Sequence, residues 1–326
     1  MTTVGSIYQI VDAIAPFSLA MGFDNPGLII GNGADEVSDV LLCLDVTPAV
    51  IEEAVKTGAQ LILSHHPLMF SPIKHVVEGE GEGSLIRSLI KNDISLIAVH
   101  TNYDTVKDGL NWQLAHQMGV SDLTPLEGDG IRDVLIRAHG VAPLWFSAYA
   151  PKDVYLEGDV TCAVLPGLSG KRAAQELKQK AIRHSVLALN SEGAFGYGLI
   201  GNIAPIKASE LAKTTKKLLN ATCVKYTGEG EKTIRRLAIA CGSGKSVFDA
   251  AIRMGADGVI TGEVSYDTAL MYTHKGLSIF EAGHFDTEKW FMASMAQRLQ
   301  IEFGKLQCNV RVHISNMSKD VYSGAV

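Results

Sequence analysis

The chain of 326 residues is long enough to bury a large core and predicts about two domains. Hydrophobic residues make up 47% of it and charged residues 20%, a balance typical of soluble globular proteins. Acidic residues (35) outnumber Lys and Arg (29), and the resulting net charge of −6 argues against binding of nucleic acid through its phosphates.

Targeting and redox signals predict a soluble, cytoplasmic protein. No run of about 18 apolar residues occurs, so we expect no membrane-spanning helix and no membrane partner. Residues 1–21 lack the basic region and the unbroken apolar region of a signal peptide. The five cysteines are widely spread and form no Cys-x-x-Cys motif, which favours reduced thiols.

Strand and helix patterns alternate in the first third of the chain. Apolar spacing predicts a helix within 7–19, where Pro16 closes the pattern. Three short apolar runs are typical of buried strands, and two helical segments connect them: strands 40–44, 61–64 and 95–99, and helices 48–56 and 84–91. This order predicts a mostly parallel sheet that is covered on both faces.

The last third of the chain repeats this order. It contains predicted strands over 236–241, 258–261, 277–281 and 310–314, and predicted helices over 209–219, 246–254, 268–274 and 287–300. Residues 57–66 also resemble 254–263 in sequence, and 102–105 resemble 284–287. Two related α/β lobes facing each other would gather their strand ends around one cleft. Chance similarity between two βαβ units is the alternative.

The middle of the chain breaks the strand–helix rhythm. It contains several Gly and Pro residues and the aromatic residues Trp145, Phe146, Tyr149 and Tyr155. We therefore predict an N-terminal α/β lobe over 1–126, an inserted subdomain over 127–192 and a C-terminal α/β lobe over 193–326.

Three predicted strands are followed by residues of the types that commonly bind metal ions. These side chains are His65, His66, Asp104, His284 and Glu288. Ligands collect outside the carboxyl ends of strands in open α/β sheets, so the five side chains predict one shared site. Imidazole and carboxylate ligands without Cys suit Zn, Fe or Mn. A helix beginning near His284 would place Glu288 one turn later on the same face.

Each of these residues alone has a simpler interpretation. Adjacent histidines are often only polar residues at a strand exit, Asp104 lies in a turn-like sequence, and His–Glu pairs occur at helix surfaces. The convergence of all five favours the metal site. His100 borders this site and would orient a ligand by a hydrogen bond.

A glycine-rich segment, Gly242-Ser243-Gly244-Lys245-Ser246, is an incomplete phosphate-binding loop. The first Gly of that motif would fall at position 239, which is Ile239. A tight turn between strand and helix is the favoured interpretation, although a helix N-terminus can also attract an anion.

Six motifs together resemble the Nif-three-like proteins, commonly named GTP cyclohydrolase I type 2 homologues. They are Phe23-Asp24-Asn25-Pro26-Gly27-Leu28, Ser64-His65-His66-Pro67-Leu68, His100-Thr101-Asn102-Tyr103-Asp104, Cys241-Gly242-Ser243-Gly244, Thr261-Gly262-Glu263 and Gly283-His284-Phe285-Asp286-Thr287-Glu288. Their order and spacing cover residues 1–125 and 193–326, and leave the predicted insert uncovered.

The resemblance implies a dinuclear centre with two divalent metal ions per chain. By motif position, its ligands are His65, His66, Asp104, His284 and Glu288, with His100, Glu263 and Asp267 around them. The resemblance also implies two α/β lobes and a ring-shaped homo-oligomer, commonly a hexamer. Two positions depart from the family pattern: Phe23 stands where Trp is frequent, and Tyr266-Asp267 stands where Tyr-His is frequent.

Two functions are consistent with these residues. The first is a metal-dependent hydrolase, in which Asp104 or Glu288 accepts a proton. Its substrate, implied by resemblance alone, is a purine nucleotide or a related cyclic amide. The second is a non-catalytic metal-binding scaffold or regulatory protein that acts through its ring assembly.

Overall fold

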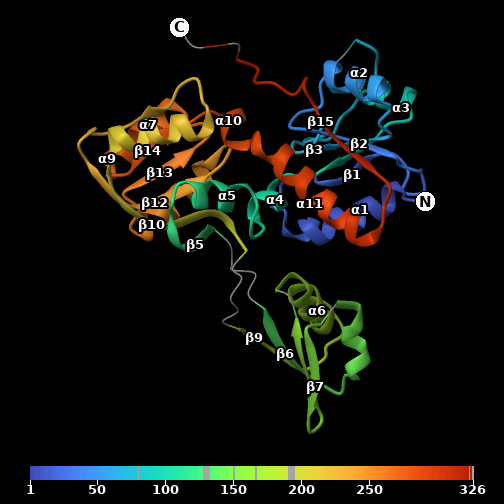
Figure 1. Cartoon of the computed structure of the whole chain (residues 1–326). Helices are drawn as coiled ribbons and strands as arrows, with labels where there is room; N and C mark the ends of the chain where they lie inside the picture. Colours follow the sequence, from blue (N-terminus) through green and yellow to red (C-terminus); the bar gives the residue numbers. More distant parts are fainter. Residues whose placement is uncertain are drawn as a thin grey trace. The chain divides into compact units, whose positions relative to one another are not determined.

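The computed structural model describes residues 1–79, 81–127, 133–149, 151–165, 167–189, 195–322 and 324. The chain divides into two compact units (Figure 1). The first unit joins Met1–Leu123 to Gly198–Val326, and the second unit is Thr124–Tyr197. Among the described residues, no helix combines the length and the apolar character needed to span a bilayer.

The first sheet of the first unit has the strand order β1-β4-β3-β2-β15. Its strands are β1 (Gly27–Ile30), β2 (Asp39–Cys43), β3 (Leu61–Ser64), β4 (Ser95–Ala98) and β15 (Arg311–Ile314). The four strands β4, β3, β2 and β15 are parallel neighbours, and β1 pairs antiparallel to β4. Every residue of β2, β3 and β4 is buried, as expected for parallel strands covered on both faces.

Helices cover both faces of this sheet (Figure 1). On one face lie α1 (Val4–Ile14) and α11 (Trp290–Leu306), and on the other lie α2 (Pro48–Thr57) and α3 (Gly81–Lys91). Local sequence sets the ends of α2. The Thr47 hydroxyl accepts a hydrogen bond from the Val50 N–H at its start, and Gly58 adopts a left-handed conformation (φ 69°) at its end.

The second sheet of the first unit has the order β11-β14-β13-β12-β10-β5. Its strands are β5 (Ser121–Glu127), β10 (Tyr197–Lys207), β11 (Lys225–Tyr226), β12 (Thr233–Ala240), β13 (Gly258–Thr261) and β14 (Ser278–Glu281). The central strands β12, β13 and β14 are parallel, whereas β10 and β11 pair antiparallel at the sides. Strand β5 belongs to the predicted N-terminal lobe by sequence, yet it lies in this second sheet.

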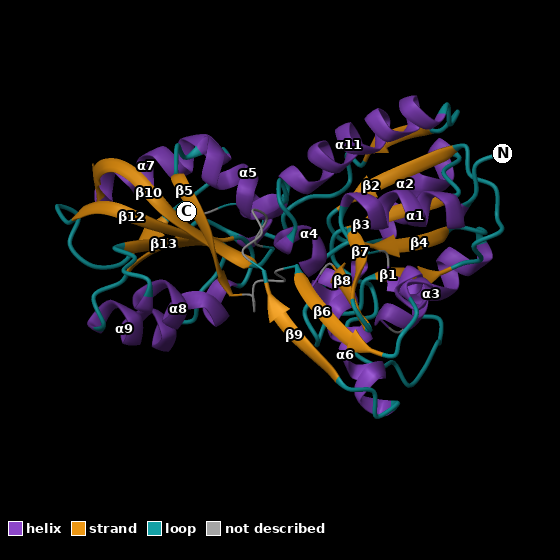
Figure 2. Cartoon of the chain, turned by 90° about the horizontal axis from the view of Figure 1, so that it is seen from below, coloured by secondary structure: helices purple, strands orange, loops and turns teal. Residues whose placement is uncertain are grey.

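Helices also cover both faces of the second sheet (Figure 2). One face carries α5 (Leu110–Gln117) and α7 (Ala208–Leu219), and the other carries α8 (Phe248–Arg253) and α9 (Tyr266–His274). The mixed α/β architecture with mostly parallel central strands confirms the predicted fold class.

Two short helices follow equivalent strands of the two sheets. Helix α4 (Thr101–Thr105) follows β4, and α10 (His284–Glu288) follows β14. The strand trios β2-β3-β4 and β12-β13-β14 have the same parallel order, which matches the sequence similarity between the halves. Side chains that follow β3, β4 and β14 therefore lie at carboxyl ends of parallel strands.

The second unit is an antiparallel sheet with one long helix. Its strand order is β7-β8-β6-β9, from β6 (Val134–His139), β7 (Asp153–Glu157), β8 (Val160–Leu165) and β9 (His184–Ala188). Helix α6 (Gly167–Gln179) and the 3-10 segment η2 (Pro143–Tyr149) accompany this sheet. Phe146 and Tyr149 lie in its own hydrophobic core. The predicted insert 127–192 falls within this unit.

Three predicted helices differ in detail from those observed. The first ends at Ile14, and 3-10 segment η1 (Phe17–Leu19) follows Pro16. The helix predicted at 246 begins as 3-10 segment η3 (Gly244–Val247) before α8. The long helix predicted from 287 is divided into α10 and α11.

Candidate metal centre

Two histidines, His65 and His66, directly follow β3 at its carboxyl end. The backbone N–H of His65 donates to the Cys43 carbonyl at 3.1 Å, and that of His66 donates to the Leu44 carbonyl at 3.0 Å. The parallel hydrogen-bond ladder thus continues beyond β3 and fixes the backbone of both residues. The predicted strand 61–64 is confirmed, and both histidines directly follow it.

The imidazole of His65 is fully buried and has a defined tautomer. Its Nδ1 lies 2.8 Å from the Val99 carbonyl oxygen, which can only accept, so Nδ1 carries the proton. Its Nε2 lies 3.8 Å from Asp104 Oδ1 and 3.8 Å from Glu288 Oε1, without a hydrogen-bond partner. Burial lowers the pKa of His65 to about 4, despite the opposing effect of Glu288, so the ring is neutral.

The imidazole of His66 lies between two carboxylates. Its Nδ1 donates to Asp45 Oδ1 at 2.7 Å, and its Nε2 lies 3.0 Å from Glu288 Oε2. Burial alone would lower the pKa of this ring, but Asp45 and Glu288 outweigh burial and raise it to about 10. Without a cation nearby, His66 is therefore protonated at neutral pH.

His284 and Glu288 approach each other across one turn of α10, as their spacing predicts. Nε2 of His284 lies 3.1 Å from Glu288 Oε2, and its Nδ1 lies 3.3 Å from Glu263 Oε2. Burial would lower the pKa of His284, but Glu288 and Glu263 raise it above its ordinary value. Neither His66 nor His284 makes a hydrogen bond of normal geometry to Glu288 Oε2.

His100 lies closer to the cluster than the sequence alone predicts. Its Nδ1 donates to Asp24 Oδ1 at 2.9 Å, and its ring centroid is 5.2 Å from that of His65 and 5.4 Å from that of His66. The second oxygen of Asp24 accepts the backbone N–H of Thr101 at 3.0 Å, which fixes the carboxylate.

The four imidazoles share one arrangement. Each Nδ1 faces an oxygen acceptor: the Val99 carbonyl for His65, Asp45 for His66, Asp24 for His100 and Glu263 for His284. Metal-binding histidines are oriented in this way, because an acceptor on one ring nitrogen leaves the other nitrogen free to bind the ion.

Two carboxylates are buried within the cluster. Asp104 on α4 is 3% exposed and Glu288 is 2% exposed, and Asp104 Oδ1 and Glu288 Oε2 have no hydrogen-bond partner. Burial, reinforced by Glu288, raises the pKa of Asp104 well above its usual range. Burial acts in the same direction on Glu288, but His284, His65 and His66 lower its pKa well below its usual range.

The ligand-capable atoms form two groups that share His66. Nitrogen atoms of His65, His66 and His100 lie within 4.8 Å of one another, as do ligand atoms of His66, His284 and Glu288. Buried carboxylate oxygens and imidazole nitrogens without hydrogen-bond partners fit the coordination chemistry of divalent Zn, Fe or Mn. The side chains present therefore fit a metal centre.

The glycine-rich segment after β12 supports this cluster. Gly242 has φ 64°, and a Cβ atom there would lie 2.1 Å from Glu288 Oε1 and 3.3 Å from His284 Nε2. The Thr287 hydroxyl accepts the Gly242 N–H at 3.1 Å, which joins this turn to α10. The segment is a tight strand-to-helix turn, as predicted, and its first glycine makes room for Glu288.

Several residues that support the cluster have no clear signal in the sequence. Asp24, Asp45 and Asn111 are separated from the histidines in sequence, and of the three only Asp24 lies in one of the six motifs. The Asn111 side chain accepts the Cys241 N–H at 2.8 Å and donates to the Asp104 carbonyl at 3.0 Å. Asp267, predicted near the ligands, lies exposed in the first turn of α9, and no contact with the cluster is found among the described residues.

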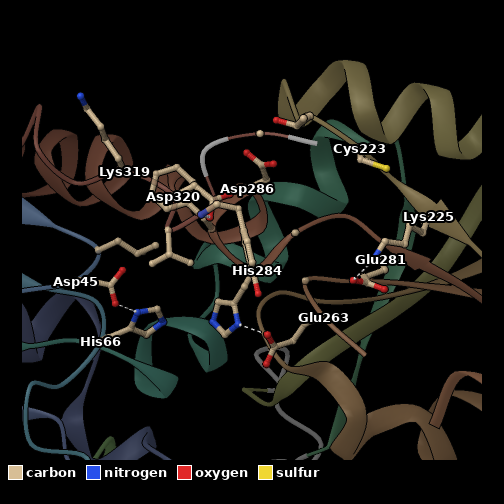
Figure 3. A pocket seen from close by; sticks show the side chains of 18 residues that line it. Asp45, His66, Cys223, Lys225, Glu263, Glu281, His284, Asp286, Lys319 and Asp320 are labelled. Atoms are coloured by element: carbon tan, nitrogen blue, oxygen red, sulfur yellow. Dashed lines mark hydrogen bonds and ion pairs between the residues drawn. The ribbon is translucent and has the colours of Figure 1, made fainter. Parts of the chain in front are cut away.

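A cavity of about 630 Å³ opens beside the cluster (Figure 3). His66 and His284 form part of its wall, together with Asp45 and Glu263, which contact their Nδ1 atoms. The C-terminal segment also contributes Lys319 and Asp320. A volume of this size is typical of small-molecule sites.

Comparison with known proteins identifies relatives along the whole chain. Residues 2–321 match the family described as Duf34/NIF3 (NGG1p interacting factor 3). A Clostridium perfringens protein named GTP cyclohydrolase 1 type 2 homolog is 28% identical over 319 residues, which cover 98% of each chain.

Solved structures show the same fold. A Bacillus cereus protein related to NIF3 superposes with a TM-score of 0.80 at 25% identity, and a Staphylococcus aureus protein superposes with 0.81 at 27% identity. Each comparison covers 99% of both chains.

Proposed function

Because the chain belongs to the Duf34/NIF3 family and gathers four imidazoles around two buried carboxylates, we propose that it is a metal-dependent hydrolase with two divalent ions per chain. Zn, Fe and Mn are the ions that suit these ligands. The five ligands of this proposal are His65, His66, Asp104, His284 and Glu288, and His100 is a sixth candidate.

One observation carries the proposal. His65 Nε2 is fully buried, carries no proton, and lies 3.8 Å from carboxylate oxygens of both Asp104 and Glu288. All of these atoms can only accept, so they repel one another unless a cation or a proton lies between them. A buried polar atom without a partner costs about 1–3 kcal/mol, and a bound cation would satisfy several at once.

The number of ions follows from the two groups of ligand-capable atoms. His65, His66 and His100 form one group, and His66, His284 and Glu288 form the other. Asp104 adds a carboxylate to the first group through its contact with His65. This set exceeds what one four-coordinate ion requires.

The proposed chemistry is hydrolysis: the oxygen of water bonds to a carbon or phosphorus centre, the bond from that centre to its leaving nitrogen or oxygen breaks, and the leaving atom takes up a proton. Divalent ions held by these histidines and carboxylates would polarise the attacked group and would lower the pKa of water from 15.7 toward about 7. Asp104 or Glu288 accepts the proton that the water releases, a role that either carboxylate would share with metal ligation. The substrate class we propose is a purine ring or a related cyclic amide, in line with the name of the relatives.

Turnover by the metal-loaded protein tests this function. The assay covers nucleosides, nucleotides, cyclic amides and phosphoesters, and compares the native protein with His65→Ala. His75→Ala is the matched control, because His75 is exposed and lies outside the cluster. Hydrolysis that disappears in His65→Ala and persists in His75→Ala supports the enzyme, and equal rates in all three proteins exclude it.

A non-catalytic scaffold is the second candidate. It is favoured by exposed aromatic side chains near His100, where Phe23 is 63% exposed and Phe70 is 47% exposed. Exposed apolar groups of this kind favour self-association, and we propose a ring-shaped homo-oligomer, with a hexamer as the expected state. Light scattering of the native protein and of Phe23→Ser tests the assembly.

A further inference from the structure

The cavity beside the cluster is poor in groups that bind phosphate. Its described wall contains two lysines, Lys225 and Lys319, and the two histidines His66 and His284, which belong to the proposed ligand set. Lys225 forms an ion pair with Glu281 at 3.1 Å, and the Lys319 side chain extends away from His66 and His284 (Figure 3). Triphosphates are normally held by Arg, by Lys or by the backbone of a complete phosphate loop, and the described wall contains no Arg.

The same wall is rich in carboxylates. Asp45 and Glu263 face ligand histidines, Glu281 faces Lys225, and Asp286 pairs with Lys289. Asp320 on the C-terminal segment makes no ion pair with any described residue. Ionised carboxylates only accept hydrogen bonds, so this wall complements N–H donors and repels phosphate oxygens.

Bound metal ions would not make the net charge of the cluster positive. Two divalent cations bring four positive charges, and five carboxylates surround the four histidines: Asp24, Asp45, Asp104, Glu263 and Glu288. The loaded cluster would therefore keep one negative charge. Glu288 Oε2, buried without a hydrogen-bond partner between His66 and His284 of the wall, is further evidence that a cation and its ligand belong here.

We propose that the cavity binds an unphosphorylated ring compound rich in N–H donors, of the size of a nucleoside, and discriminates against nucleoside triphosphates. The volume of about 630 Å³ accommodates a nucleoside. This inference rests on the proposed hydrolase and narrows its substrate class to a nucleobase, a nucleoside or a comparable cyclic amide.

Guanosine and GTP are suitable probes because they share one ring system and differ in the triphosphate. Calorimetric titration of the metal-loaded full chain should show guanosine binding about tenfold more tightly than GTP, or better, at the same ionic strength. The metal content is measured before and after each titration, since GTP also chelates ions. Equal or tighter binding of GTP, or no binding of guanosine at millimolar concentration, overturns the inference.

A charge variant tests the cause of this preference. Glu281→Gln removes the partner of Lys225 and frees its ammonium group in the cavity, so the affinity for GTP should rise about tenfold. Glu231→Gln is the matched control, because it frees Lys207 from an exposed pair outside the cavity wall. Asp320→Asn should also raise the affinity for GTP. This residue lies on the C-terminal segment, so the substitution changes no strand.

The outcomes separate this inference from the proposed function. A protein that takes up no metal contradicts the hydrolase itself. A protein that takes up metal but prefers GTP, or in which Glu281→Gln and Glu231→Gln behave alike, contradicts only the inferred substrate class.

Discussion

His65 Nε2 lies 3.8 Å from Glu288 Oε1, and the two residues come from different sheets of the same unit. His65 follows β3 in the first sheet, and Glu288 lies on α10 after β14 of the second. The candidate metal centre therefore forms only when both sheets are assembled. Any ion bound there would stabilise the native state, because the unfolded chain holds these ligands far apart.

Metal content is the most direct prediction. Gently purified protein should contain close to two divalent ions per chain, since the two groups of ligand atoms share only His66. Elemental analysis with and without reconstitution measures this number. Less than about half an ion per chain after reconstitution would contradict the centre.

Three substitutions should rank in a fixed order for metal affinity. Glu288→Gln should be the most damaging, because it removes a negative charge in the middle of the cluster while keeping the side-chain shape. His100→Gln should reduce affinity about 10–100-fold. Asp267→Asn should have the smallest effect, because Asp267 is exposed on α9.

Competitive metal titration of these variants gives the ranking, with circular dichroism as the check on folding. A largest effect for Asp267→Asn would show that the ligand set is wrong. Glu263 and Asp267 would then have to belong to the centre.

Gly242→Ala should weaken metal binding by displacing Glu288. The new methyl group would lie 2.1 Å from Glu288 Oε1, in a backbone conformation (φ 64°) that already disfavours alanine. Gly58→Ala is the matched control, with φ 69° and open space around its Cβ. Both should lower the free energy of unfolding by about 1–2 kcal/mol, and only Gly242→Ala should lower metal affinity. Equal metal affinity in both variants would argue against the supporting role of Gly242.

Metal binding near neutral pH should release a proton from His66. Its pKa in the metal-free protein is raised to about 10 from the ordinary 6.5, so Nε2 must lose a proton before it can bind an ion. Calorimetry in two buffers of different ionisation enthalpy counts the protons released. Asp45→Asn should reduce this number, because the Asp45 carboxylate helps to raise the pKa.

The same groups set the pH dependence of the metal-free protein. The stabilising contribution of His66 is complete below pH 6.5 and is lost as the pH rises through about 10. His65 has a lowered pKa, about 4, so its contribution is complete above pH 6.5 and is lost as the pH falls through about 4. Urea unfolding across this range measures both slopes, and an unchanged acid slope in His65→Gln would contradict the second.

The second unit should be dispensable for the metal centre. It has its own core, and all residues of the cluster belong to the first unit. Replacing 131–190 with a short Gly/Ser linker should leave a folded protein that binds metal with native stoichiometry. Folded material without metal binding would show that the second unit helps to build the site.

The sequence alone determines most helices and strands that have a regular apolar pattern. The strand predicted at 61–64 coincides with β3, and the strand predicted at 258–261 coincides with β13, because their apolar runs are unbroken and bounded by turns. The sequence predicts that Glu288 faces His284, because helical periodicity fixes their relative direction over one turn. Such features depend on residues only a few positions apart.

Tertiary structure alone decided which distant groups meet. The partners of the four Nδ1 atoms, the passage of β5 into the second sheet and the space that Gly242 leaves for Glu288 follow from packing between segments far apart in the chain. In the sequence, nothing distinguishes Asp45 from other polar residues that follow a strand. Its role depends on the fold, in which its carboxylate accepts a hydrogen bond from His66 Nδ1. The antiparallel strands of the second unit are not predicted from the sequence, since mostly exposed edge strands such as β7 carry a weak apolar pattern. Local periodicity indicates which face of a helix or strand is apolar. Which element packs against that face depends on how the whole chain buries its apolar surface.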